Sequence, residues 1–122
     1  MKFKPADLNV ELELGASSIR SVRLGDMIGA INTVEPDLDF SPALATQPAG
    51  HCQVPHWGYV VEGSLTIHYQ DGEEEVVSAG DLFYMQPGHT AVSGPDGAVT
   101  ADFSPATPMT KFFEDVRSAV SG

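Results

Sequence analysis

The sequence predicts an all-β jelly roll with one short C-terminal α-helix. Apolar and polar residues alternate at period two along several segments, which is typical of strands with one buried face. Turn residues, chiefly Gly, Pro and Asp, separate these segments about every 8–12 residues. Only the stretch from about Pro108 to Ala119 has apolar residues at helical spacing. A jelly roll suits many short strands because it folds two sheets face to face and so manages their edges.

Three strands are predicted in the N-terminal part, at 8–14, 18–24 and 27–34. In the first, the apolar residues Leu8, Val10, Leu12 and Leu14 alternate with polar ones, so this strand is expected to bury one face. The stretch 35–50 is predicted to be a long loop. Three prolines there would interrupt a hydrogen-bonded ladder: Pro36, Pro42 and Pro48.

The strand signals are denser after His56. The dipeptide Asp71-Gly72 predicts a two-residue hairpin turn, because Gly tolerates the positive φ of a type I′ turn. The segment 82–85 is apolar throughout, which predicts a strand buried on both faces. A turn is expected at 94–97, where the sequence is Gly-Pro-Asp-Gly. The remaining predicted strands of this part are 59–61, 65–70, 73–77, 91–93 and 98–103.

The C-terminal helix has its own start signal. Thr107 is predicted as the N-cap and Pro108 as the first helical residue. The apolar residues Phe112, Phe113, Val116 and Val120 then fall on one helical face. The helix is therefore expected to lie across the barrel or against a partner subunit.

Composition limits the function. The 122 residues suit a single domain, 1–122. Six basic against seventeen acidic residues give a formal charge of −11, which argues against nucleic acid and against an anionic membrane surface as partners. No apolar run approaches the ~18 residues of a membrane span, and no secretory signal is evident. With Cys52 as the single cysteine, a cytoplasmic protein is the simplest expectation.

Two segments carry a family resemblance. The first runs Gly50-His51-Cys52-Gln53-Val54-Pro55-His56-Trp57-Gly58-Tyr59-Val60-Val61-Glu62-Gly63, and the second Gly80-Asp81-Leu82-Phe83-Tyr84-Met85-Gln86-Pro87-Gly88-His89. They resemble the first and second motifs of the cupin superfamily. Their residue sequence also looks like that of a group of small bacterial single-domain cupins. The resemblance is close over about residues 50–93 and rests on the strand pattern elsewhere. It implies a double-stranded β-helix, the cupin jelly roll, for the single domain.

The motifs also depart from the family pattern. His56 stands where the family has its ligand Glu, and His51 falls on the second His of the family's His-x-His pair. The first His of that pair is replaced by Ala49. His89 lies two residues before the usual His position, which Ala91 occupies; a two-residue step preserves the face of a strand. The resemblance therefore implies a rearranged metal site.

His51, His56 and His89 are the predicted ligands of a divalent metal, either Zn, Ni, Fe or Mn, because neutral imidazoles hold such ions. Cys52 competes with His51 for one position if the loop register shifts by one residue. His68 shares its strand face with Thr66 and Gln70 and is expected to be exposed. Three aromatic residues are expected in the core or in a pocket wall: Trp57, Phe83 and Phe103.

Two functions remain open from the sequence. The resemblance implies a metal-dependent enzyme, such as a dioxygenase or isomerase, that acts on a small polar molecule. The alternative is a non-catalytic small-molecule-binding or sensor domain, and a third possibility is a barrel that binds no metal. A homodimer is expected, because a symmetry mate commonly covers the exposed edge strands of a small jelly roll.

Overall fold

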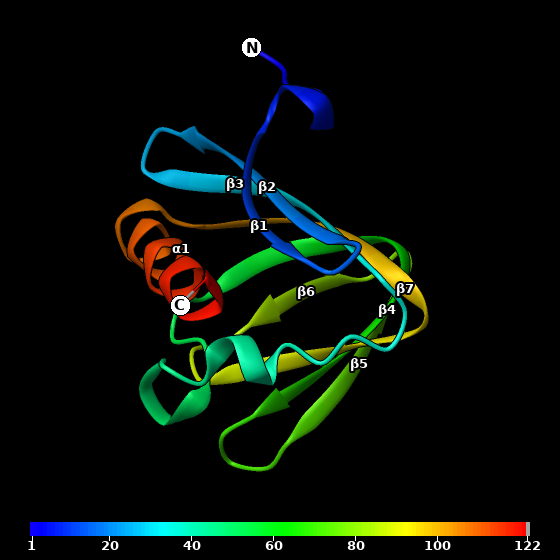
Figure 1. Ribbon diagram of the computed structural model, residues 1–122. Coiled ribbons are helices and arrows are strands. Elements are labelled where there is room, and N and C mark those ends of the chain that lie inside the picture. The colour runs from blue at the N-terminus through cyan, green and yellow to red at the C-terminus, as the bar shows by residue number, and fades with distance from the viewer. Residues whose placement is uncertain (122) are drawn as a thin grey trace.

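The computed structural model describes residues 1–121 and has the predicted jelly-roll architecture. The described part of the chain contains seven antiparallel strands, one α-helix, α1 (Ala106–Ser121), and three short 3₁₀ helices. The strands are β1 (Asn9–Leu14), β2 (Ser17–Leu24), β3 (Met27–Val34), β4 (His56–Tyr69), β5 (Glu74–Ser78), β6 (Leu82–Met85) and β7 (His89–Pro105). Figure 1 shows the strands curling around an interior that α1 covers on one side.

Two long strands, β4 and β7, organise the sheet. The strand order is β1-β2-β3-β7-β4-β5, and β6 also pairs with β4. The first residues of β4 pair with β6, its later residues pair with β5, and β7 runs beside it for most of its length. Each long strand therefore contributes to both walls of the barrel, and residues at its start and in its middle face the same interior.

The continuity of β4 and β7 corrects the sequence prediction. The predicted strands 59–61 and 65–70 form one strand, which ends at Tyr69, and the turn expected at 94–97 lies inside β7. Gly63 and Gly97 have positive φ values of 71° and 73°, and the pairing register shifts on both sides of Glu62 and Gly63. These glycines form bulges that bend the strands without ending them.

Two predictions of buried faces were also wrong. Val10 is exposed because the register between β1 and β2 shifts between Val10 and Leu12, which breaks the period-two pattern. Strand β6 is buried on one face only, since Phe83 and Met85 are buried while Leu82 is 83% exposed. An apolar run alone does not show which of its faces is covered.

Helix α1 closes the interior beside β1. It begins at Ala106, so Thr107 and Pro108 lie within its first turn rather than at its cap; this corrects the predicted start. Its buried residues Met109, Phe112, Phe113 and Val116 join a core cluster with Leu12 and Ile28. The predicted packing across the barrel is confirmed. No helix among residues 1–121 is long and apolar enough to cross a membrane.

The predicted long loop, 35–50, packs against the barrel. It contains two 3₁₀ turns, Ser41–Leu44 and Pro48–Gly50, and Leu44 is buried in the same cluster as α1. A hydrogen bond from the Phe40 amide to the Ala91 carbonyl attaches the loop to β7. The loop thus brings the following residues, from His51 onward, to the rim of the barrel.

Candidate metal centre and its cavity

A backbone bridge places Cys52 beside His89. The Cys52 amide donates to the His89 carbonyl at 2.8 Å, and the His89 amide donates to the Cys52 carbonyl at 3.2 Å. Residues paired in this antiparallel way carry their side chains on the same side of the ladder. The loop before β4 and the first residue of β7 therefore direct a thiol and an imidazole into the same part of the interior.

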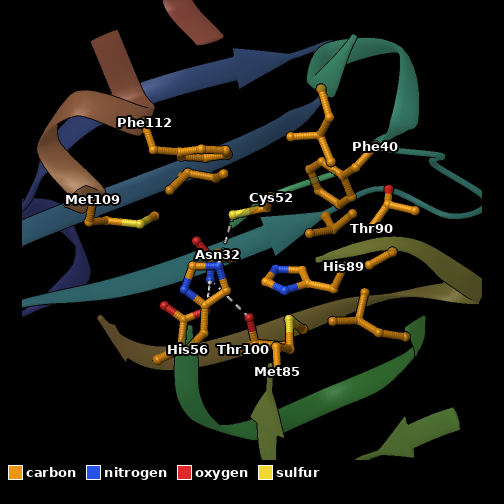
Figure 2. A pocket seen from close by; sticks show the side chains of 16 residues that line it. Asn32, Phe40, Cys52, His56, Met85, His89, Thr90, Thr100, Met109 and Phe112 are labelled. Atoms are coloured by element: carbon orange, nitrogen blue, oxygen red, sulfur yellow. Dashed lines mark hydrogen bonds between the residues drawn. The ribbon is translucent and has the colours of Figure 1, made fainter. Parts of the chain in front are cut away.

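His56 completes the group from the first residue of β4. Its Nε2 lies 3.6 Å from the Cys52 Sγ, and its Nδ1 lies 2.6 Å from the Oγ of Ser104. The rings of His56 and His89 meet edge to face, with centroids 4.9 Å apart. All three residues are buried, and Figure 2 shows their side chains directed toward one another.

The tautomer of His89 follows from its hydrogen bond. Nδ1 lies 2.7 Å from the Gln86 carbonyl oxygen, which can only accept. In the neutral ring, Nδ1 must carry the hydrogen, so Nε2 offers a free lone pair. Ser104 leaves the same arrangement open to His56, because its hydroxyl can accept from Nδ1. Carbonyl or hydroxyl partners of this kind orient metal-binding histidines in proteins.

The three ligand atoms fit a metal ion of zinc size. One atom from each of Cys52, His56 and His89 lies within 4.8 Å of the others. A tetrahedral zinc with bonds of about 2.3 Å to sulfur and about 2.0 Å to nitrogen separates sulfur from nitrogen by about 3.5 Å and two nitrogens by about 3.3 Å. The Sγ–Nε2 separation of 3.6 Å between Cys52 and His56 is close to the first value. The donor types therefore suit a three-ligand divalent site, and the Cys52–His56 pair has the spacing of one.

Burial sets the protonation of these groups. Desolvation lowers the pKa of His56 to about 3, with a smaller contribution from His89. Desolvation also lowers the pKa of His89, against the opposing Gln86 hydrogen bond. The pKa of the Cys52 thiol is raised to about 12, mainly because burial disfavours the thiolate. At neutral pH the metal-free site therefore holds neutral imidazoles and a protonated thiol.

The three residues line a partly open cavity of about 110 Å³. Its wall is largely apolar, and Met109 and Phe112 of α1 cover it opposite the histidines (Figure 2). A site that opens on a cavity differs from a structural zinc site, whose ligands enclose the ion. A small molecule in the cavity would lie directly against the imidazoles and the thiol.

A second polar group in the cavity wall was not predicted from the sequence. Asp102 and Thr100 of β7 lie beside Asn32 of β3, and all three line the cavity. The Asn32 Nδ2 donates to Thr100 Oγ1 at 3.0 Å and to Asp102 Oδ2 at 3.1 Å. Burial raises the pKa of Asp102 to about 7, although the hydrogen bond from Asn32 opposes the shift.

A sequence signal for this group exists in β7. Thr100, Asp102 and Ser104 are buried, whereas Phe103 between them is exposed. The strand thus turns its polar residues inward and an aromatic residue outward. This pattern has the same period of two as an ordinary surface strand, so alternation alone does not reveal which face of β7 lies inside.

The structure separates His51 from the other predicted ligands. His51 is half-buried, and its Nδ1 lies 2.7 Å from the Ala49 carbonyl oxygen. It is not among the three residues whose ligand atoms converge in the described part of the chain. His68, expected to be exposed, is partly exposed and pairs with Glu74 across the hairpin, with 3.1 Å between Nδ1 and Oε2.

Of the three aromatic residues expected in the core or pocket wall, one is buried. Phe83 packs in the second core cluster with Val60 and Ile67. Trp57 is 45% exposed and Phe103 is 46% exposed. The prediction for these two was wrong because they occupy outward positions of β4 and β7, next to the inward-facing His56 and Ser104.

Comparisons with known proteins agree with this architecture. Residues 38–91 match the family model described as Cupin domain. A solved structure of unknown function from Rhizobium leguminosarum bv. viciae 3841 is 27% identical, with a TM-score of 0.65, and the match covers 86% of this chain and 95% of that one. An RmlC-like cupin from Shewanella frigidimarina NCIMB 400 is 21% identical, with a TM-score of 0.60 and coverage of 86% and 90%.

An enzyme is also among the similar structures. A tryptophan-to-phenylalanine variant of oxalate decarboxylase from Bacillus subtilis is 23% identical, with a TM-score of 0.63. The match covers 86% of this chain but only 29% of the enzyme, and at this identity it supports the fold alone. A search of the curated proteins found no match.

Proposed function

Because the chain belongs to the cupin superfamily, we propose that it is a metal-dependent enzyme that binds a divalent cation through Cys52, His56 and His89 and acts on a small molecule in the adjoining cavity. One observation carries this proposal: the three converging ligand atoms face a cavity instead of being enclosed by protein. Three protein ligands with an open position are typical of catalytic metal sites.

The donor set favours zinc. Thiolate sulfur is a soft ligand that prefers zinc over harder ions, and imidazole suits zinc, iron and nickel. Manganese, which prefers oxygen ligands, fits Cys52 least. We therefore rank zinc first among the four metals that the sequence leaves open. When bound, such a cation acts as a Lewis acid toward a substrate oxygen or a water.

The residues of the chain prepare this site in three ways. The Gln86 carbonyl and the Ser104 hydroxyl fix the two imidazole rings with Nε2 directed to the centre. The apolar side chains of α1 cover one side of the cavity and limit the access of water from that side, which strengthens electrostatic interactions inside it. Asp102 supplies a buried carboxyl group, whose pKa is about 7 in the metal-free chain and which a bound cation would hold in its ionised, proton-accepting form.

Elemental analysis of purified variants tests the ligand set. The wild type is expected to hold about one zinc per chain, and both His56→Ala and Cys52→Ser are expected to lose it. His51→Ala is the matched control, since His51 lies outside the cluster, and should keep the metal. Circular dichroism shows whether each variant is folded. Metal loss in His51→Ala with retention in Cys52→Ser would move the site to His51.

The alternative function is a non-catalytic small-molecule binder or sensor. The largely apolar cavity wall and its cover by α1 favour this alternative, because a buried apolar pocket can retain a ligand without chemistry. A screen of small molecules with the zinc-loaded chain separates the two functions. Turnover that disappears in His56→Ala supports the enzyme, whereas binding without turnover supports the sensor.

We also propose a homodimer formed through the outer face of β4, β6 and β7. Five large uncharged side chains are exposed there: Trp57, Tyr59, Leu82, Tyr84 and Phe103. Trp57 and Tyr84 stack with centroids 5.2 Å apart, so part of this surface is already ordered. In a chain of charge −11, two copies repel each other elsewhere but can approach through an uncharged face. A second copy is therefore the occupant that this face fits.

Light scattering after size exclusion tests the dimer. The wild type is expected at twice the chain mass and Phe103→Glu at the mass of a monomer. Val76→Glu is the control, because Val76 is exposed on β5, outside this face. A monomeric wild type would refute the dimer. The lone thiol, proposed here as a metal ligand, also fits the reducing cytoplasm, which we propose as the location.

A further inference from the structure

The cavity beside the metal centre has a charge pattern that limits its ligand. Of its lining residues, only Asp102 is acidic, and none of the six lysines and arginines, all within the described residues, lines it. Lysine and arginine are the usual partners of bound carboxylates and phosphates in proteins. An anionic ligand would therefore find no protein cation in this cavity.

A bound metal does not supply the missing positive charge. A divalent cation held by the Cys52 thiolate leaves one net positive charge, and this charge favours the ionised form of a nearby carboxyl. The Asp102 carboxylate then brings the total to zero. An anion added to this balanced group would give a net negative charge inside a largely apolar wall, which is unfavourable at low dielectric.

Two unused hydrogen-bonding atoms on the Asp102 side of the cavity point to the same class of ligand. A third, the buried Thr90 Oγ1, which has no hydrogen-bond partner within residues 1–121, can donate as well as accept, so it does not discriminate between ligand classes. Both hydrogens of the Asn32 amide are donated, to Thr100 and to Asp102. In the described part of the chain, the Asn32 Oδ1 and the Asp102 Oδ1 have no hydrogen-bond partner. These two oxygens are acceptors, so this side of the cavity is suited to a ligand that donates an N–H or O–H.

The volume sets the size of the ligand. A dry cavity of about 150 Å³ accommodates benzene, which has six non-hydrogen atoms. By this comparison, the cavity of about 110 Å³ holds about four or five non-hydrogen atoms. A larger ligand would have to extend out of the cavity or displace Met109 or Phe112, the side chains of α1 in the wall.

We propose that the cavity selects a small neutral molecule with a hydrogen-bond donor, such as a short amide or alcohol, and that Asp102 with Asn32 is the specificity-determining pair. This inference rests on the proposed function, since it assigns the substrate class of the same site. It sets the chain apart from any protein that binds a small carboxylate through a basic side chain.

Acetamide and acetate test the proposal, because they have nearly the same shape and differ in charge and donor capacity. Their binding to the zinc-loaded wild type, measured by NMR titration, is expected to favour acetamide by at least about tenfold, since like-charge contact with Asp102 disfavours acetate. In Asp102→Asn the ratio should fall to about threefold or less, because the variant keeps the shape but removes the charge.

Further measurements separate this proposal from the metal site. Zinc content is determined on the same samples, and Asp102→Asn should keep its zinc. The metal-free His56→Ala variant, measured above about pH 8 so that Asp102 is ionised, should retain a preference for acetamide, because Asp102 and Asn32 remain. Equal or tighter binding of acetate by the wild type, an unchanged ratio in Asp102→Asn, or no binding of either probe to zinc-loaded protein would overturn the proposal. Absence of zinc with the preference intact would overturn only the metal site.

Discussion

The buried carboxyl of Asp102 makes the stability of the fold depend on pH in a way that Asp102→Asn removes. Its pKa rises from 3.8 to about 7 on folding because burial disfavours the charged form. Between these values the native state holds a proton that the unfolded state has lost. The contribution of Asp102 to the free energy of unfolding is therefore fully present below about pH 4 and is lost as the pH rises through about 7.

The magnitude follows from the shift. At about 1.4 kcal/mol per pKa unit, ionised Asp102 lowers the free energy of unfolding by as much as about 4 kcal/mol above pH 7. His56 acts in the opposite direction, because its pKa falls from 6.5 to about 3 and the unfolded state takes up the proton. In the wild type the two effects nearly cancel between about pH 4 and about pH 6.5.

In Asp102→Asn, Asp102 no longer cancels the effect of His56 on the free energy of unfolding. The asparagine can still accept the hydrogen bond from Asn32, so at about pH 4 the variant should match the wild type. Its stability should then exceed that of the wild type by about 1.4 kcal/mol more for each pH unit, until the difference levels off near pH 7. The variant should therefore become distinctly more stable toward neutral pH, whereas the wild type should change less, by the smaller contribution of His89.

Urea unfolding followed by circular dichroism measures this difference. Both proteins are unfolded in the presence of a chelator, at several values between about pH 4.5 and about pH 8.5, and the free energies are extrapolated to water. Asp96→Asn is the control, because Asp96 is exposed in the folded state as well. The reasoning is refuted if the difference between Asp102→Asn and the wild type does not change with pH.

Three further predictions concern the bulge, the cavity wall and the metal. Gly63→Ala should lower stability by more than about 2 kcal/mol in urea unfolding, because a Cβ there meets the Gly97 carbonyl and φ is positive. The control Gly72→Ala, where φ is positive but the space is open, should lower stability by only about 1 kcal/mol. Equal losses in the two variants would contradict the steric argument. Phe112→Ala should lower the free energy of unfolding by about 3–5 kcal/mol, which thermal unfolding checks. The variant should also admit ligands larger than acetamide, which NMR titration checks. An unchanged ligand size would show that another residue sets the limit. Zinc binding should release one proton from the Cys52 thiol, whose pKa is about 12. The apparent affinity for zinc should therefore fall about tenfold per pH unit from about pH 8 to about pH 6. Calorimetry in two buffers should detect the released proton, and no release would argue against the thiolate ligand.

Much of the strand pattern could be predicted from local sequence. Strands β2, β3 and β5 begin and end within a residue of the predicted ranges, because each has residues suited to a half-buried ladder. The continuity of β4 through Gly63 could not be predicted in this way. A glycine reads as a stop in a single strand, and only the neighbouring strand shows that the bulge continues the pairing.

The candidate site could likewise be predicted only in part. The motif resemblance pointed to His56 and His89, and it left His51 and Cys52 as alternatives. The structure brings Cys52 into the cluster through a backbone bridge to His89, a contact between segments far apart in the sequence. Asp102 escaped prediction because one acidic residue in an alternating strand usually faces solvent, and its burial depends on which side of β7 the barrel encloses.

Helix α1 has a consequence for how the protein can diversify. The three candidate ligands lie on β4, β7 and the loop before β4, whereas Met109 and Phe112 come from the last element of the chain. Chemistry and shape selection thus belong to separate segments. Substitutions confined to the C-terminal helix can resize the chamber while every candidate ligand stays in place, so related chains with the same ligands need not share a substrate.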